Sequence, residues 1–132
     1  MTHQARHLSV AIEQPASTVY AFASQPQNLP LWASGLGEIR QVRGEWIVHV
    51  TNKDMRLRFA QPNEYGVLDH WLLMDDGTEI YVPLRVIANG SGCEVILTLL
   101  RQPDMPDAKF EADAEWVMRD LAALKQRMEA LA

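Results

Sequence analysis

The sequence predicts an α+β fold in which one antiparallel sheet of seven strands curves around a long C-terminal helix. Three observations lead to this prediction. An alternating apolar segment opens the chain and precedes two short helical segments, and six strand-like segments follow each other closely over 38–102. The segment 107–131 then carries a single apolar stripe at helical spacing.

The first strand and the two short helices are predicted from local signals near the N-terminus. Apolar residues alternate with polar ones over 8–12, which is typical of a half-buried strand. Pro15 suits the first turn of a helix over 16–24, and Pro26 ends that helix. A second short helix is predicted from Asn28 to the glycines that follow it.

The middle of the chain reads as a series of strands separated by turn residues. The six segments are 38–43, 45–51, 54–61, 65–74, 78–88 and 93–102. The connections are too short for crossover helices, so consecutive strands are expected to pair as antiparallel hairpins.

Turn chemistry predicts the register of these hairpins and therefore which side chains face inward. A glycine-containing turn at 75–77 pairs His70 with Val82, and a loop at 89–92 pairs Ala88 with Cys93. An earlier turn at 52–53 is expected to pair three further couples on the inner face. These couples are Trp46 with Phe59, Val48 with Leu57, and Val50 with Met55.

On the outer face the same register places Trp71 opposite Tyr81 as a cross-strand aromatic pair. Asp69 and Arg85 also fall on this face, where we expect a surface ion pair that contributes little stability. An alternative role for Trp71 and Tyr81 is to form a contact face for another protein.

The C-terminal helix is predicted over 107–131, with Pro106 in its first turn, acidic residues in its first half and basic residues near its end. Its apolar stripe consists of Phe110, Ala114, Val117, Leu121, Leu124, Met128 and Leu131. This stripe has to be buried, and the inner face of the sheet is the surface available for it.

Composition excludes several classes of function. The 132 residues suit one domain, 1–132, and the net charge of −5 with scattered basic residues disfavours nucleic acid as a partner. Cys93 is the only cysteine, and the sequence contains neither a phosphate-binding loop, a dinucleotide fingerprint nor a zinc-protease motif, so no metal and no cofactor are expected. No apolar run is long enough to span a membrane, and 1–13 does not read as a signal peptide, so a cytoplasmic location is expected.

Several segments resemble the START-related and birch-pollen-allergen-like superfamily, whose fold is the helix grip. They are the strand leading into Pro15–Phe22, the segment Pro26–Ala33, and the helix from Phe110 to Leu131. Gly66–His70, Tyr81–Val86 and Arg101–Pro103 look more narrowly like a small bacterial, polyketide-cyclase-like branch. The resemblance covers nearly the whole chain and implies the fold. It implies no catalytic residue, because members of the superfamily differ in function.

His70 is the one strongly polar side chain expected in mid-strand on the inner face, where an imidazole can bond a ligand or act as a general base. The expected ligand-binding residues are His70, Trp32, Trp46, Phe59, Leu68, Leu72, Val82, Leu84, Leu97, Val117 and Leu121. The leading hypothesis is binding or carriage of a small apolar molecule in a cavity between sheet and helix.

Two alternatives stay open. One is a cyclase-like or dehydratase-like enzyme that uses His70 without a metal, and the other is an interaction module whose interior is filled by side chains. The register gives His70 no acidic or basic partner, which favours the carrier over the enzyme. A homodimer also stays open.

Overall fold

The computed structural model describes residues 1–50 and 52–131, with eight strands, two α-helices and one short 3-10 helix. In chain order the elements are β1 (Ala5–Ile12), α1 (Ala16–Ala23), η1 (Pro26–Leu31), β2 (Ile39–Val42), β3 (Glu45–Val50), β4 (Lys53–Phe59), β5 (His70–Leu73), β6 (Glu79–Val82), β7 (Leu84–Asn89), β8 (Gly92–Leu100) and α2 (Asp107–Glu129). The predicted order of elements is therefore correct. Position 51, the predicted end of the 45–51 strand, lies outside the described residues.

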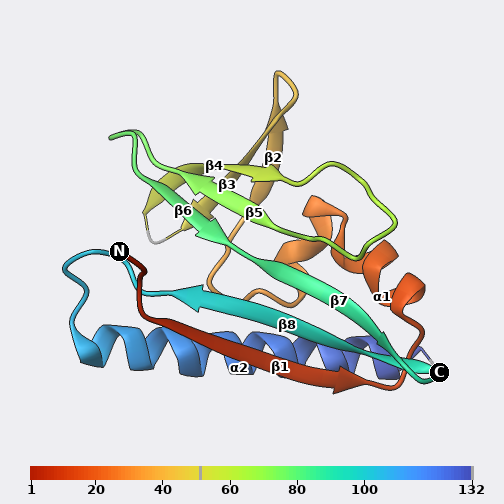
Figure 1. Ribbon diagram of the computed structural model, residues 1–132. Coiled ribbons are helices and arrows are strands. Elements are labelled where there is room, and N and C mark those ends of the chain that lie inside the picture. Colours follow the sequence, from red (N-terminus) through yellow and green to blue (C-terminus); the bar gives the residue numbers. More distant parts are fainter. Residues whose placement is uncertain (51, 132) are drawn as a thin grey trace.

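The prediction of one seven-stranded sheet is wrong. The strands form a three-stranded sheet in the order β1-β8-β7 and a five-stranded sheet in the order β2-β3-β4-β5-β6, and all pairings are antiparallel. Figure 1 shows the five-stranded sheet standing above the three-stranded one, with α2 running along the latter.

Pro83 is the physical reason for the division. It interrupts the predicted 78–88 strand, so that β6 pairs with β5 up to Val82 and β7 pairs with β8 from Leu84 onward. Proline has no N–H to donate to a neighbouring strand, but its carbonyl still accepts a hydrogen bond from the Thr98 N–H at 3.0 Å. The chain therefore changes sheets within one residue.

The other long predicted strand, 65–74, is also shortened, because only its second half forms β5. Its first half touches β7 through single bonds, Leu68 N–H to the Leu84 carbonyl at 2.8 Å and Val86 N–H to the Gly66 carbonyl at 2.9 Å. Gly66 has a φ of +71°, and a Cβ there would lie 2.1 Å from the Val86 carbonyl oxygen. Only glycine permits this close approach of two backbones.

Two of the three predicted hairpin registers are confirmed. His70 pairs with Val82 and Ala88 pairs with Cys93. The hairpin of β3 and β4 differs by two residues, because Val50 pairs with Lys53 and Val48 therefore lies opposite Met55. Since side chains alternate with a period of two, this error changes the partners but leaves the same side chains on the inner face.

The two short helices follow β1 as predicted. α1 buries Val19 and Ala23, whereas the second helix is a 3-10 helix that begins at Pro26, two residues earlier than predicted. Pro30 lies inside η1, and proline tolerates this short 3-10 segment better than the interior of an α-helix.

The long helix α2 packs mainly against β1 and buries five of the seven residues of the predicted apolar stripe. Val117 is half-buried, and Leu131 lies beyond the end of the helix and is 67% exposed. Leu121, Leu124 and Met128 are fully buried in one core shared with both sheets. Polar contacts join the helix to the start of the chain, for example Lys125 Nζ to the Ala11 carbonyl at 2.7 Å. The predicted burial of the helix against the sheet is thus confirmed, although the helix follows the smaller of the two sheets.

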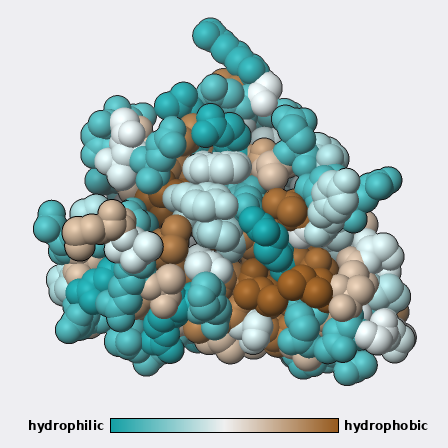
Figure 2. Space-filling model, in the orientation of Figure 1, coloured by the Kyte–Doolittle hydropathy of each residue, from teal (hydrophilic) through white to brown (hydrophobic). Residues whose placement is uncertain are grey.

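The side of the three-stranded sheet that faces away from α2 carries mixed side chains. Figure 2 shows a small apolar patch over β7 and β8 within a mainly polar surface. No helix of the described chain is long and apolar enough to cross a membrane.

Candidate ligand-binding cavity

A cavity of about 320 Å³ lies between the five-stranded sheet, η1 and α2, and its walls are almost wholly apolar. Seven of the predicted site residues line it: Trp32, His70, Leu72, Val82, Leu97, Val117 and Leu121. These residues come from the end of η1 and from β5, β6, β8 and α2, which are far apart in the sequence and meet around the cavity. The cavity opens toward the surface beside Gly35 and Trp116.

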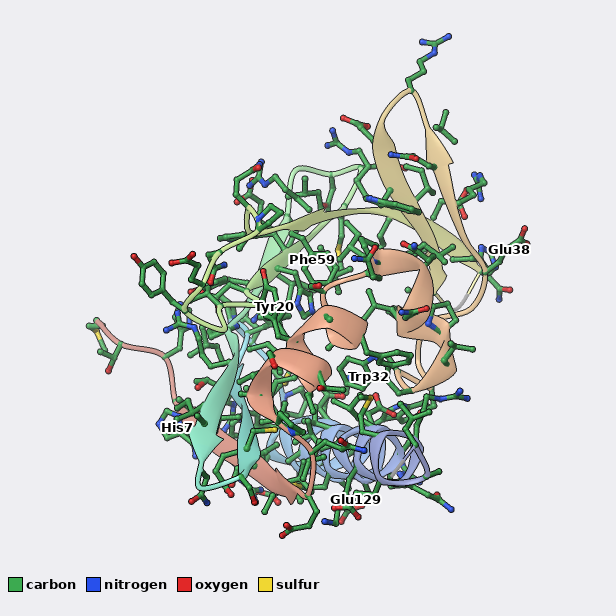
Figure 3. The ribbon with its side chains drawn as sticks, turned by 90° about the vertical axis from the view of Figure 1, so that its right-hand side faces the viewer. His7, Tyr20, Trp32, Glu38, Phe59 and Glu129 are labelled. Carbon is green, nitrogen blue, oxygen red and sulfur yellow. The ribbon has the colours of Figure 1, made fainter. Side chains whose placement is uncertain are left out.

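Four predicted site residues do not line this cavity. Leu68 and Leu84 are 2% and 1% exposed and belong to the packed core where the chain changes sheets. Trp46 and Phe59 border a different surface groove, which also contains Arg56. Figure 3 shows Phe59 farther from α2 than Trp32, which lies between the short helices and α2.

Phe59 contributes indirectly, because it packs against the imidazole of His70. The two residues are paired across β4 and β5, and their ring centroids are 5.1 Å apart. The Phe59 ring therefore helps to hold the imidazole in its orientation.

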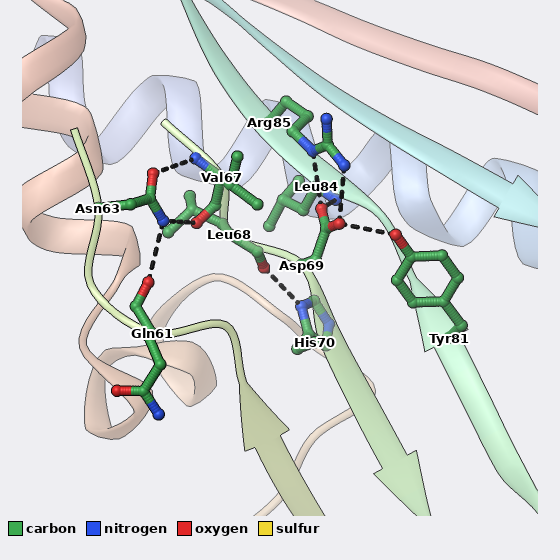
Figure 4. A network of polar contacts seen from close by, with 9 residues as sticks. All are labelled: Gln61, Asn63, Val67, Leu68, Asp69, His70, Tyr81, Leu84 and Arg85. Atoms are coloured by element: carbon green, nitrogen blue, oxygen red, sulfur yellow. Dashed lines mark hydrogen bonds and ion pairs between the residues drawn. The ribbon is translucent and has the colours of Figure 1, made fainter. Parts of the chain in front are cut away.

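The His70 side chain is half-buried and hydrogen-bonded to its own strand. Its Nδ1 lies 3.1 Å from the Leu68 carbonyl oxygen, as drawn in Figure 4. Burial lowers the pKa of His70 below its ordinary value, although the Leu68 carbonyl and the Asp69 charge act in the opposite direction. The neutral ring is thus favoured near neutral pH.

The tautomer of His70 follows from this hydrogen bond. A carbonyl oxygen only accepts, so Nδ1 carries the proton and Nε2 bears the lone pair. Nε2 has no hydrogen-bond partner among the residues described and is not sealed from solvent. His70 therefore offers an acceptor to a ligand, whereas an imidazole that donates to a ligand carbonyl would need the other tautomer.

Asp120 is a second polar residue of the cavity wall, and the sequence analysis did not select it. Its Oδ1 accepts hydrogen bonds from Ser34 N–H at 3.1 Å and Ser34 Oγ at 2.6 Å. Oδ2 has no hydrogen-bond partner in the described part of the chain. Burial raises the pKa of Asp120, and the Ser34 bonds and the Arg119 charge limit the effect.

The signal for Asp120 was present in the helical spacing. Positions 117, 121 and 124 lie on the apolar stripe, and position 120 falls among them at spacings of three and four residues. A carboxylate on an otherwise apolar stripe is unusual enough to mark a candidate site residue.

Two tryptophans line the cavity. Trp32 is 5% exposed, and its indole N–H has no hydrogen-bond partner in the described structure. Trp116 was not predicted as a site residue and is 45% exposed, with the Arg119 guanidinium 5.2 Å above its ring. Both indole N–H groups are uncharged donors.

A buried carboxylate next to His70 holds the point where the chain changes sheets. Asp69 is 4% exposed and accepts four hydrogen bonds, from Tyr81 Oη at 2.7 Å, Leu84 N–H at 3.0 Å, and Arg85 Nε and Nη2 at 2.8 Å each (Figure 4). The predicted ion pair of Asp69 and Arg85 thus forms, but its expected position at the surface is wrong, because the carboxylate turns inward to bond the Leu84 N–H that follows Pro83. Trp71 does stack on Tyr81 as predicted, with ring centroids 5.2 Å apart.

Acid is expected to weaken the fold through Asp69. Burial alone would raise the pKa of Asp69, but the hydrogen bonds from Arg85, Tyr81 and Leu84 outweigh it and lower the pKa from 3.8 to about 2. A carboxyl with a lowered pKa in the folded state stabilises the protein fully above its unfolded pKa and loses this effect as pH falls toward the folded pKa. The difference corresponds to about 2 kcal/mol, lost between about pH 4 and about pH 2.

Thermal unfolding recorded stepwise from about pH 5 downward tests this expectation in the wild type and in Asp69→Asn. The wild type should lose about 2 kcal/mol more than the variant. Parallel pH curves would show that Asp69 does not carry the effect. Asp75→Asn, at an exposed position of the next hairpin, is the matched control and should retain the wild-type pH dependence.

Among the described residues no three His, Cys, Asp or Glu side chains lie close enough to hold a metal ion. The hydrogen-bonding side chains among the described residues that line the cavity are one imidazole, one carboxylate and two indoles, and the indole N–H of Trp32 is sealed from solvent.

Several solved structures have the same fold as this chain. A START superfamily protein from Mycobacterium smegmatis matches with a TM-score of 0.75 and 14% identity, over 97% of this chain and 99% of that chain. Ara h 8.0201 matches with a TM-score of 0.64 and 10% identity, over 94% and 96%. The di-domain ARO/CYC BexL from the BE-7585A biosynthetic pathway matches with a TM-score of 0.73 and 17% identity, over 96% of this chain and 46% of that one.

No protein-family model matches the sequence, and the search of curated proteins finds no match. The solved structures share fewer than one residue in five with this chain, so the likeness concerns the fold. The chain has the fold of the START superfamily, and the resemblance seen in the sequence is confirmed at that level.

Proposed function

We propose that this protein binds a small, mostly apolar molecule in the cavity between the five-stranded sheet and α2. The observation that carries the proposal is the cavity itself, about 320 Å³ with nearly apolar walls and few polar side chains. Ligand sites for small molecules have this character, in which apolar surface supplies affinity and a few polar groups orient the ligand. A space of this size also argues against an interior filled by side chains.

Filling the cavity is expected to abolish binding of an apolar probe. Val117 lines the cavity from α2, and Val117→Trp would place an indole in the space that a ligand needs. Naphthalene, measured by equilibrium dialysis, should bind the wild type and bind the variant at least about tenfold more weakly.

Met118→Trp is the matched control, because Met118 is 39% exposed on the same helix and does not line the cavity. It should bind naphthalene like the wild type. Equal affinity in Val117→Trp, at an unchanged melting temperature, would show that the probe binds elsewhere. Native mass spectrometry after organic extraction complements this test by looking for a molecule retained through purification.

An acid–base enzyme of the cyclase or dehydratase type is the second candidate. Asp120 supplies the second titratable group that the sequence register did not give to His70, and both residues line the same cavity. An enzyme would lose turnover in His70→Phe while ligand affinity changes little, and a carrier would lose affinity alone.

A further inference from the structure

The polar groups on the cavity wall define what a ligand's polar end must do. His70 Nε2 and Asp120 Oδ2 are acceptors without a hydrogen-bond partner among the described residues. The indole N–H of Trp116, a residue of the cavity wall, is an uncharged donor, whereas the Trp32 indole N–H is sealed from solvent. A ligand in the cavity therefore meets two open acceptors and one uncharged donor.

Of a hydroxyl, an ammonium and a carboxylate, only the hydroxyl serves both kinds of partner. Its hydrogen can be donated to His70 or Asp120, and its oxygen can accept from an indole N–H. An ammonium donates and cannot accept, whereas a carboxylate accepts and cannot donate.

Charge separates the head groups further. No lysine or arginine of the described chain lines the cavity, so a carboxylate would enter an apolar space without a cationic partner and beside the acidic Asp120. An ammonium would gain the attraction of the Asp120 charge, but it would have to give up its hydration to enter an otherwise apolar space. A neutral head group loses the least hydration when it enters.

We propose that the ligand of this cavity is a neutral, hydroxyl-bearing apolar molecule, an alcohol or phenol, and that Asp120 excludes carboxylates. This inference rests on the proposed binding function. It goes further by assigning the chemical class of the ligand and a role in selectivity to Asp120.

A set of probes that differ only in the head group tests the inference: naphthalene, and naphthol, naphthoate and naphthylmethylamine substituted at the same ring position. Equilibrium dialysis at neutral pH gives the dissociation constants. Naphthol should bind the wild type about tenfold more tightly than naphthalene, and naphthoate about tenfold more weakly. Naphthylmethylamine should bind more weakly than naphthol.

Two variants assign the effects to residues. Asp120→Asn removes the charge and keeps the size, so naphthoate should gain about tenfold while naphthalene stays within twofold of the wild type. His70→Phe keeps an aromatic ring against Phe59 and removes the acceptor, so naphthol should lose about fivefold or more. Asp113→Asn is the matched control, since Asp113 pairs with Lys109 on the same helix and does not line the cavity.

The outcomes separate the two proposals. If naphthalene and all its derivatives fail to bind the wild type, the proposed function fails and the inference fails with it. If naphthalene binds but naphthoate or naphthylmethylamine equals naphthol, the binding function stands and the hydroxyl assignment is overturned. If naphthoate is rejected equally by the wild type and Asp120→Asn, Asp120 is not the selecting group.

Discussion

Leu124→Asp should leave most of the protein unfolded at room temperature. Leu124 is fully buried on the apolar stripe of α2 and does not line the cavity, so an introduced carboxylate there would have neither water nor a partner. Burying such a group costs several kcal/mol, against a total stability of about 5–15 kcal/mol for domains of this kind. Leu121 is a less clear test, because a carboxylate at that position could reach the cavity.

Urea unfolding followed by circular dichroism measures the effect. Ala122→Asp is the matched control, because it introduces the same residue at an exposed position of the same helix. It should cost less than about 1 kcal/mol, mainly through helix propensity. If both variants unfold at the same urea concentration, the stripe is not part of the core.

Asp69→Ala should lower stability by about 3 kcal/mol and the melting temperature by about 10 °C. The substitution leaves the Leu84 N–H without its acceptor and the Arg85 guanidinium without its carboxylate, and it removes the only acceptor that the Tyr81 hydroxyl has in the described structure. These groups lie where the chain passes from one sheet to the other, so the substitution should also loosen the packing of the two sheets against each other. Differential scanning calorimetry gives the shift.

Two variants identify the source of this effect. Tyr81→Phe removes a single hydrogen bond and should cost about 1 kcal/mol. Asp75→Ala removes an exposed carboxylate from the neighbouring turn and should stay within about 0.5 kcal/mol of the wild type. A shift in Asp69→Ala no larger than that in Tyr81→Phe would mean that the Leu84 and Arg85 bonds contribute nothing.

The residues that line the cavity could be predicted where the period of a helix or the register of a hairpin determines which way their side chains face. Val117 and Leu121 follow from the period of the helix, and His70, Leu72 and Val82 follow from the glycine turn that sets their register. Trp46 and Phe59 were assigned to the correct face but to the wrong space, because alternation says which side a residue faces and not how far along the sheet the helix extends.

The sequence by itself determined the order of elements, the antiparallel pairing, the buried stripe of α2 and two of three hairpin registers, because each depends on short-range periodicity or turn chemistry. Tertiary structure decided the division into two sheets, the inward turn of Asp69 and the hydrogen bonds from Ser34 to Asp120. Each of these depends on a contact between residues distant along the chain, such as the bond from Thr98 to the Pro83 carbonyl. A local sequence pattern does not show which backbone group, distant along the chain, will lack a hydrogen-bond partner. In this protein the Leu84 N–H, at the boundary between the sheets, is such a group, and Asp69 turns inward to bond it.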